Sequence, residues 1–278
     1  MHTIRNAFLA VTLAMLSACT TAPTEDVMTG FVDDPQALER VWLGTRVVFP
    51  QTPKHFFARP ESGLDRAVAE LQPQNLPAVI YLNDCEPLHM ASNEMLRTVS
   101  GLAEAGFAVF VPNSLDRPRA AFCNDAKTYE ATPEAVRLRV SELLYVRERI
   151  QGLSWVDPQN VFAVGSGLGG VAVTKLANAS FPAVAAVGVN CHPTGLQPGI
   201  TASDSVAVLV LAGSRDTTLR ANPLNRNCAA RAEMHKANRH AVILDNVGHD
   251  VTDDPKAVPQ IAEFLKSHRL RPIQTVYK

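Results

Sequence analysis

The sequence predicts an α/β fold with a mostly parallel central sheet and helices on both faces. Short and almost entirely apolar runs, such as Ala78–Leu82, suit strands that are buried on both sides. These runs alternate with longer segments that are typical of helices, which is the pattern of strand and crossover helix in a parallel sheet. The composition does not change along the chain beyond the N-terminal segment, so we expect a single domain over residues 37–278.

The expected elements follow one another along the chain. Strands are expected at Arg46–Phe49, His55–Ala58, Ala78–Leu82, Phe107–Val111, Val161–Val164, Val184–Val189, Val206–Leu211 and His240–Leu244, and helices at Ser92–Ala105, Thr132–Gln151, Leu168–Ala177, Pro223–Ala237 and Pro255–His268. Asn93 or Ser92 can cap the first of these helices, and Gly106 ends it. In the second, Pro133 stands at the first position and Glu142 lies on a flank.

Composition and charge exclude several classes of protein. The chain has 278 residues, of which 46% are hydrophobic and 19% are charged, and this is the profile of a globular domain. Intrinsic disorder requires lower hydrophobicity and higher net charge. The 26 Lys and Arg residues balance 27 Asp and Glu residues, so there is no cationic surplus to displace phosphate counterions. We therefore expect no nucleic-acid partner.

The N-terminal segment has the features of an export signal. Ala7–Leu16 is an apolar run broken only by Thr12, and it is too short to span a bilayer. It leads into Leu16-Ser17-Ala18-Cys19, which resembles a bacterial lipobox. Residues 1–18 are therefore predicted to be a lipoprotein signal peptide. The alternative is an ordinary signal peptide followed by a chance cysteine.

The lipobox interpretation predicts a lipid anchor. Cys19 would carry the lipid and become the first residue of the mature chain, and residues 19–36 would form a tether to the folded domain. The expected partner of this end of the protein is a membrane. Thr20, and not Asp, follows the cysteine, which favours the periplasmic side of the outer membrane in a Gram-negative cell.

Four cysteines remain beyond the lipidation site: Cys85, Cys123, Cys191 and Cys228. An even number in an exported chain suggests disulfide bonds. We favour pairing Cys85 with Cys123 and Cys191 with Cys228, each of which would stabilise the fold by about 4 kcal/mol in the chain-entropy model. Four unpaired thiols are the alternative. The spacings are not those of a zinc site.

The segment Gly165-Ser166-Gly167-Leu168-Gly169 joins an expected strand to an expected helix. This is the context of a nucleophile elbow, G-x-S-x-G, but the nucleophile position is Gly167, which has no side chain to attack a carbonyl. A register slipped to Ser166 would place bulky Val164 and Leu168 where strand and helix pass closely, so we disfavour it. The segment also matches the phosphate-binding pattern G-x-G-x-x-G, but it falls late in the chain, and no acidic residue ends the next expected strand to hold a ribose.

Two further residues follow buried strands in the order expected of a catalytic triad. Asp216 lies in the loop after Val206–Leu211, and His249 lies in the loop after His240–Leu244. The order nucleophile, acid and then histidine is that of α/β-hydrolases. In an active enzyme His249 would accept the proton of the nucleophile, and Asp216 would orient the imidazole and stabilise its charged form.

Together these motifs resemble the α/β-hydrolase superfamily, and most closely its dienelactone hydrolase-like branch. The resemblance implies an α/β-hydrolase fold and an elbow Cys or Ser that attacks esters or lactones. Besides Gly167, the oxyanion loop departs from it: related enzymes tend to read Leu-His-Gly-Cys-Gly where this chain reads Leu82-Asn83-Asp84-Cys85-Glu86. Negative charge there opposes the developing oxyanion, whose stabilisation is worth about 3–4 kcal/mol per donor.

Three functions are consistent with this sequence. The first is a catalytically degenerate envelope lipoprotein that binds a small molecule or an envelope protein, with Asn83, Asp84 and Leu168 near the binding region. The second is an active ester or lactone hydrolase whose nucleophile is Ser166, Cys191 or a water activated by His249. The third is a site for Ca²⁺ or Mg²⁺ formed by Asp84, Glu86 and His89 near His249, for which the spacing is unspecific. We favour the first, without a cofactor or a metal.

Overall fold

The computed structural model describes residues 34–58, 63–84, 88, 92–116, 133–176, 181–189, 200–217 and 237–270. Its centre is an eight-stranded sheet with the strand order β2-β1-β4-β3-β5-β6-β7-β8. The strands are β1 (Arg46–Val48), β2 (Phe57–Ala58), β3 (Leu76–Leu82), β4 (Ala108–Val111), β5 (Val156–Ser166), β6 (Ala183–Val187), β7 (Ala207–Gly213) and β8 (Arg239–Leu244). Only β1 pairs antiparallel with its neighbours β2 and β4, and the pairs from β4 to β8 are parallel.

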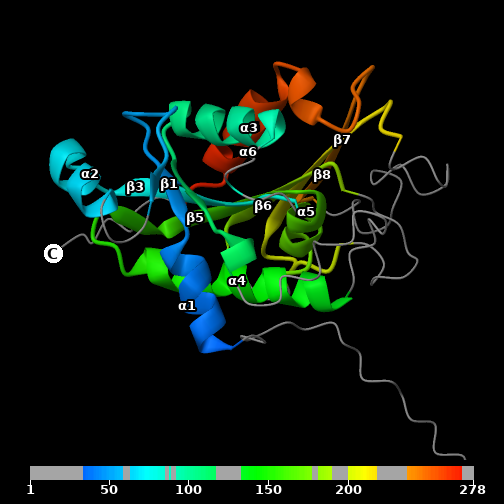
Figure 1. The fold of residues 1–278 in the computed structure, drawn as a ribbon. Helices are drawn as coiled ribbons and strands as arrows, with labels where there is room; N and C mark the ends of the chain where they lie inside the picture. The colour runs from blue at the N-terminus through cyan, green and yellow to red at the C-terminus, as the bar shows by residue number, and fades with distance from the viewer. Residues whose placement is uncertain are drawn as a thin grey trace, which may run out of the picture.

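Helices cover both faces of this sheet (Figure 1). They are α1 (Pro35–Leu43), α2 (Leu64–Leu71), α3 (Asn93–Glu104), α4 (Pro133–Gln151), α5 (Gly167–Val173) and α6 (Ala257–Ser267), with short 3-10 turns η2 (Ser114–Asp116) and η7 (Val251–Asp253). Helices α3 and α6 pack on one face, and α1, α4 and α5 pack on the other. The predicted fold class, a mostly parallel sheet between two layers of helices, is therefore confirmed.

The central strands are buried on both sides because alternate residues enter two different cores. In β3, Ile80 and Leu82 pack with Leu143 of α4 on one side, while Val79 and Tyr81 pack toward α3 and α6 on the other. This explains why the strands are continuous apolar runs and show no polar alternation. Because the strands from β4 to β8 pair in parallel, their carboxyl ends lie at the same edge of the sheet.

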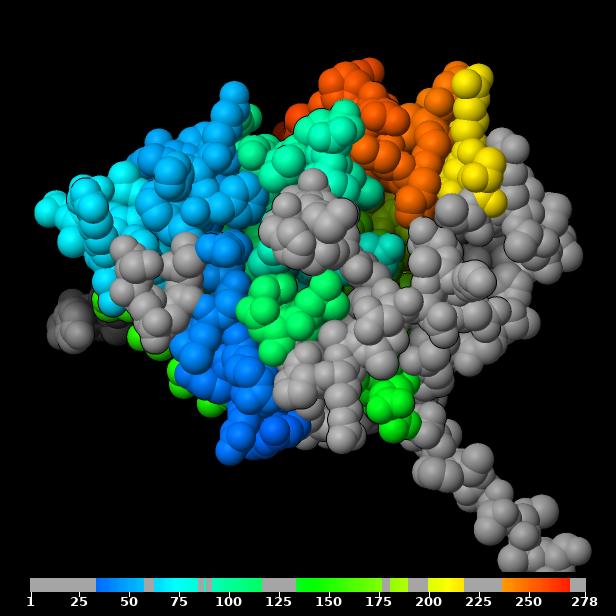
Figure 2. All heavy atoms as spheres, in the orientation of Figure 1, coloured from blue at the N-terminus to red at the C-terminus, as the bar shows by residue number. Residues whose placement is uncertain are grey.

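Two helices were not predicted from the sequence. Helix α1 begins at Pro35, inside the segment expected to be a tether (residues 19–36), and Asp34 caps it by accepting a hydrogen bond from the backbone N–H of Gln36. Its apolar face buries Trp42 against the sheet. Helix α2 follows Gly63. In Figure 2 the blue α1 and β1 run down the visible face, with the cyan α2 beside them.

Several expected boundaries shift by a few residues, and β5 shows the largest change. It was expected at Val161–Val164 but starts at Val156, because its first residues pair with Leu76 before an irregularity in register. Of the expected helix at Pro223–Ala237, only Ala237 is described, and it lies in a turn. The export signal and all five cysteines lie outside the described residues. Within the described residues, no helix has the length and apolar character of a membrane span.

Candidate active site

The turn from β5 into α5 has the geometry of an elbow. Gly167 has a φ of 51°, in the left-handed region that glycine adopts without the steric penalty of a side chain. A Cβ on Gly165 would lie 2.3 Å from the backbone of Gly169, and one on Gly169 would lie 2.1 Å from the carbonyl oxygen of Leu82. The spacing of small residues in the motif thus follows from the close approach of strand and helix.

Asp84 occupies the space that an elbow nucleophile would need. A Cβ built on Gly167 would meet the Asp84 carboxylate, at 2.4 Å from Cγ and 2.6 and 2.7 Å from the two oxygens. The Oδ1 atom of this carboxylate accepts a hydrogen bond of 2.9 Å from the backbone N–H of Leu168. In α/β-hydrolases the N–H after the nucleophile is an oxyanion donor. The Leu168 N–H, which would be the oxyanion donor, is therefore already hydrogen-bonded to the carboxylate of Asp84.

Ser166, considered above as a nucleophile in a slipped register, is turned into the protein. Its side chain is 4% exposed, and its hydroxyl is 3.0 Å from the hydroxyl of Tyr81. Tyr81 belongs to the core on the α3 and α6 side of the sheet. The described hydrogen bond of His249 goes to Asp216 and not to Ser166. This placement gives Ser166 a structural role in the core.

His249 and Asp216 lie together at the carboxyl edge of the sheet. His249 Nδ1 is 2.7 Å from Asp216 Oδ2, and the Asp216 side chain is fully buried, while that of His249 is 42% exposed. The loops after β7 and β8 hold this pair in place, since Arg215 N donates to the carbonyl of Val247 at 2.8 Å. Gly188, which follows β6, borders the imidazole: a Cβ there would lie 3.2 Å from His249 Cε1.

The surroundings of His249 favour its charged form. Partial burial lowers the pKa of the imidazole, but the hydrogen bond to Asp216 and the negative charges of Asp216, Glu94 and Asp84 raise it by more. The resulting pKa of His249 lies above its ordinary value of 6.5. Because Asp84 contributes to this shift, the dyad lies within electrostatic reach of the carboxylate over the elbow.

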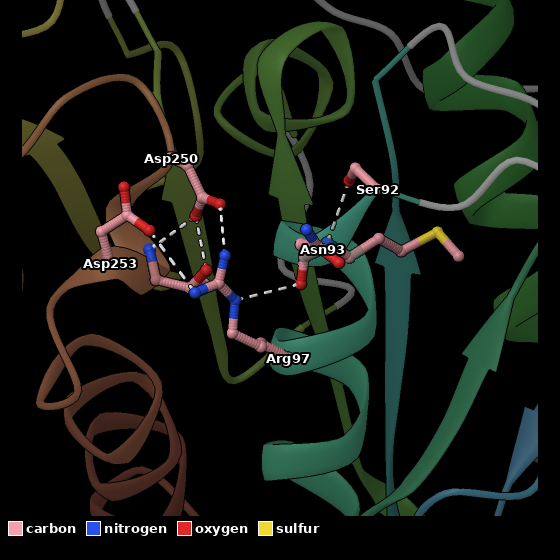
Figure 3. A network of polar contacts seen from close by, with 7 residues as sticks. Ser92, Asn93, Arg97, Asp250 and Asp253 are labelled. Carbon is pink, nitrogen blue, oxygen red and sulfur yellow. Dashed lines mark hydrogen bonds and ion pairs between the residues drawn. The ribbon is translucent and has the colours of Figure 1, made fainter.

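The loop that follows His249 is tied to helix α3. Figure 3 shows Arg97 of α3 reaching Asp250 and Asp253, with nitrogen–oxygen distances of 2.9 and 3.4 Å. Asp250 also accepts a hydrogen bond from the N–H of Thr252, and this caps η7. At the start of α3, Ser92 accepts a hydrogen bond of 3.1 Å from the backbone N–H of Met95, so Ser92 and not Asn93 is the cap of this helix. These contacts fix the direction in which the His249 loop leaves β8.

A buried ion pair supports the loop that carries Asp84, and the sequence did not reveal it. Arg139 Nη1 is 2.9 Å from Glu142 Oε2, with side chains 1% and 0% exposed. Glu142, expected on the flank of its helix, also accepts a hydrogen bond of 2.7 Å from Ser114 Oγ. Arg139 Nη2 donates to the backbone carbonyl of Asn83 and lies 3.3 Å from its Oδ1. Helix α4 thereby holds the residue next to Asp84.

The remaining candidate residues lie outside the described part of the chain. They are Cys19, Cys85, Cys123, Cys191 and Cys228, together with Glu86 and His89. The disulfide pairing, the anchor and the Cys191 nucleophile therefore stay predictions. In the parts of the chain that the structure covers, no three His, Cys, Asp or Glu side chains group in a way that could hold a metal ion.

The fold and this constellation define an α/β hydrolase: an elbow after a central strand, an acid after β7 and a histidine after β8. The sequence model that describes the dienelactone hydrolase family matches residues 65–263 of this chain. The chain belongs to the dienelactone hydrolase family. No curated protein of known sequence matches it.

Solved structures with the same fold have low sequence identity. The dienelactone hydrolase-like promiscuous phosphotriesterase P91 from metagenomic libraries is 17% identical, with a TM-score of 0.52 over 72% of this chain and 89% of that one. Est1E from Butyrivibrio proteoclasticus is 14% identical, with a TM-score of 0.48 over 72% of this chain and 90% of that one. The likeness to P91 supports the fold and says nothing of the substrate.

Proposed function

We propose that this protein is a lipid-anchored member of the dienelactone hydrolase family at the cell envelope, whose degenerate active site binds a small molecule or an envelope protein and does not hydrolyse esters through an acyl-enzyme. One observation carries the proposal. The Asp84 carboxylate lies where the nucleophile side chain would stand, above Gly167, and takes the hydrogen bond of the Leu168 N–H. Nucleophile and oxyanion donor are thus lost together.

The chemical argument follows from the charge that develops during acyl transfer. Attack on a carbonyl creates an oxyanion, and each preorganised donor stabilises it by about 3–4 kcal/mol. The Leu168 N–H cannot serve an oxyanion while it is bound to Asp84, and a substrate oxyanion beside that carboxylate would meet like charge. The residual rates that survive loss of a nucleophile in other hydrolases depend on an intact oxyanion hole.

A second candidate function rests on the retained dyad. The hydrogen bond of 2.7 Å between His249 and Asp216 leaves the imidazole partly exposed and oriented as a base. A water activated by His249 could hydrolyse an activated ester without an elbow nucleophile. The buried position of Ser166 and its hydrogen bond to Tyr81 do not support Ser166 as the nucleophile.

Turnover of p-nitrophenyl acetate by the purified soluble domain distinguishes the two functions. The proposal predicts the same rate for the wild type, His249→Ala and heat-inactivated protein. Ser166→Ala serves as the control for the buried hydroxyl. Saturable turnover that disappears in His249→Ala and persists in Ser166→Ala would replace the first function with the second.

The anchor is supported by the order of apolar run, leucine, two small residues and Cys19 in the sequence. In a Gram-negative host that expresses the full chain, the protein should partition into membranes and incorporate labelled palmitate. Cys19→Ser should abolish the label and leave the chain unprocessed, because the lipid is attached before the signal peptide is removed. Unlabelled wild-type protein in the soluble periplasmic fraction would refute the anchor.

A further inference from the structure

The hydrogen bonds around the Asp84 loop assign a role to two residues of α4 that the proposed function leaves unused. We propose that Arg139 and Glu142 are positioning residues that hold Asp84 in the oxyanion hole as a built-in anion, so that the site above Gly167 rejects anionic ligands and accepts neutral or cationic ones. This inference rests on the proposed function for the identity of the site, and it adds the charge class of the ligand.

The ion pair is buried too deeply to act as a surface contact. Arg139 and Glu142 are 1% and 0% exposed in their side chains. Taking both charges out of water costs several kcal/mol per ion, and replacing such a pair with apolar residues often leaves stability unchanged or higher. Stability alone therefore does not account for the pair. What it does provide is a fixed set of donors at the end of β3.

The donors act on the residue that precedes Asp84. Arg139 Nη2 donates to the backbone carbonyl of Asn83, whose side chain is 3% exposed. Glu142 orients the guanidinium, and Ser114 after β4 donates to Glu142 at 2.7 Å, so the pair joins α4 to two strand ends. With the Asn83 carbonyl fixed in this way, the carboxylate above Gly167 belongs to the next residue in the chain, Asp84.

A carboxylate held this way competes strongly with free anions for the Leu168 N–H. A tethered group binds at an effective concentration set by its linker, and a short and rigid linker makes this concentration high. The Asp84 Oδ1 atom already accepts the hydrogen bond of 2.9 Å. An incoming carboxylate or phosphate would have to displace it and then lie beside it. A neutral or cationic donor could instead approach Oδ2, to which no described residue donates a hydrogen bond.

The test follows the Leu168 amide by nuclear magnetic resonance while acetate is added at constant ionic strength and constant pH. The wild type should show no saturable shift. Asp84→Gly should show one, with an affinity for acetate at least about tenfold higher than any in the wild type. The Arg139→Met/Glu142→Leu double variant replaces the buried ion pair with apolar side chains of similar size. It should also gain a saturable shift, because Asp84 is no longer held.

Two further variants keep the inference testable if the double variant does not fold. Arg139→Lys retains the charge beside Glu142, but its single ammonium cannot also reach Asn83, so it should gain an intermediate response. Ser114→Ala removes one hydrogen bond to Glu142 and leaves the bond to Asn83, so it should behave as the wild type. A role limited to stability would change the melting temperatures of these variants without changing the acetate response.

Two results would overturn the inference. If acetate shifts the wild-type amide as strongly as that of Asp84→Gly, the carboxylate does not exclude anions. If the variants of Arg139 fold and still ignore acetate while Asp84→Gly binds it, the pair does not position Asp84. Neither readout depends on turnover, so ester hydrolysis by the wild type would refute the proposed function without deciding this inference.

Discussion

A double-mutant cycle between Gly167 and Asp84 tests the contact at the centre of the site. Gly167→Ser introduces a side chain at a φ of 51°, which costs about 1–2 kcal/mol in backbone strain. It also places Cβ 2.4 Å from Asp84 Cγ, so the carboxylate must move. Moving it breaks the charge-assisted hydrogen bond to Leu168 N–H, worth about 1.5–3 kcal/mol. The sum predicts a loss of about 2.5–5 kcal/mol in the free energy of unfolding.

The second variant, Asp84→Gly, gives up the same hydrogen bond and creates room for the serine. Because the bond can be lost only once, the double variant should be less destabilised than the sum of the two single variants, by about 1.5–3 kcal/mol. Urea unfolding can be followed by the fluorescence of Trp42 and Trp155, which are buried in the folded protein.

Gly106→Ser is the matched control for this cycle. Gly106 also has a positive φ, of 100°, but a Cβ there would have no heavy atom within 4 Å. The Gly106→Ser substitution measures the cost of backbone strain without a steric clash. Its effect on the free energy of unfolding should add to that of Asp84→Gly to within about 0.5 kcal/mol. If Gly167→Ser and Asp84→Gly are equally additive, the carboxylate does not occupy the nucleophile position and the account of the site is wrong.

Three further predictions concern the histidine and its loop. The raised pKa of His249 means that the folded state binds the proton more tightly, so the contribution of His249 to stability is complete below about pH 6.5 and is lost as the pH rises through the raised pKa. In His249→Gln this decline of the unfolding free energy with pH should disappear, and an unchanged pH profile would contradict the predicted direction. Asp216→Asn should lower the pKa of His249, measured from the imidazole resonances, because it removes the hydrogen-bonded charge; a pKa that stays raised would show that other groups cause the shift. Arg97→Met breaks two partly exposed ion pairs, so it should cost only about 0.2–1 kcal/mol per pair in urea unfolding, with a larger effect at low salt, and a loss above 3 kcal/mol would show that the pairs are not screened as their exposure implies.

The fold could be predicted from the sequence because the buried strands are continuous hydrophobic runs that stand out from the neighbouring segments. Runs such as Ala78–Leu82 have no charged residue, and burial on both faces is the physical reason. Helices α1 and α2 were missed because both are short and lie outside the strand–helix repeat. Helix α1 also begins inside the polar segment that was expected to be a tether, so its cap, Asp34, was not recognised as one.

The candidate site was predicted in part, and the division has a physical cause. Gly167, Asp216 and His249 each follow a parallel strand, so the topology alone brings them to one edge of the sheet. Asp84 was expected near the oxyanion hole, but the direction of its side chain depends on contacts distant in the sequence. Arg139 was not singled out, because a charged residue in a long helix is usually solvated and only tertiary packing shows that this one is buried.

The proposed function requires that the site has no nucleophile, and covalent labelling measures this most directly. A fluorophosphonate reacts with an activated serine and leaves an adduct that intact-protein mass spectrometry detects. We expect no adduct on the wild type, and an adduct on Gly167→Ser/Asp84→Gly that is lost when His249 is also replaced by Ala. A stoichiometric adduct on the wild-type protein, on Ser166 or on any other residue, that depends on His249 would contradict it.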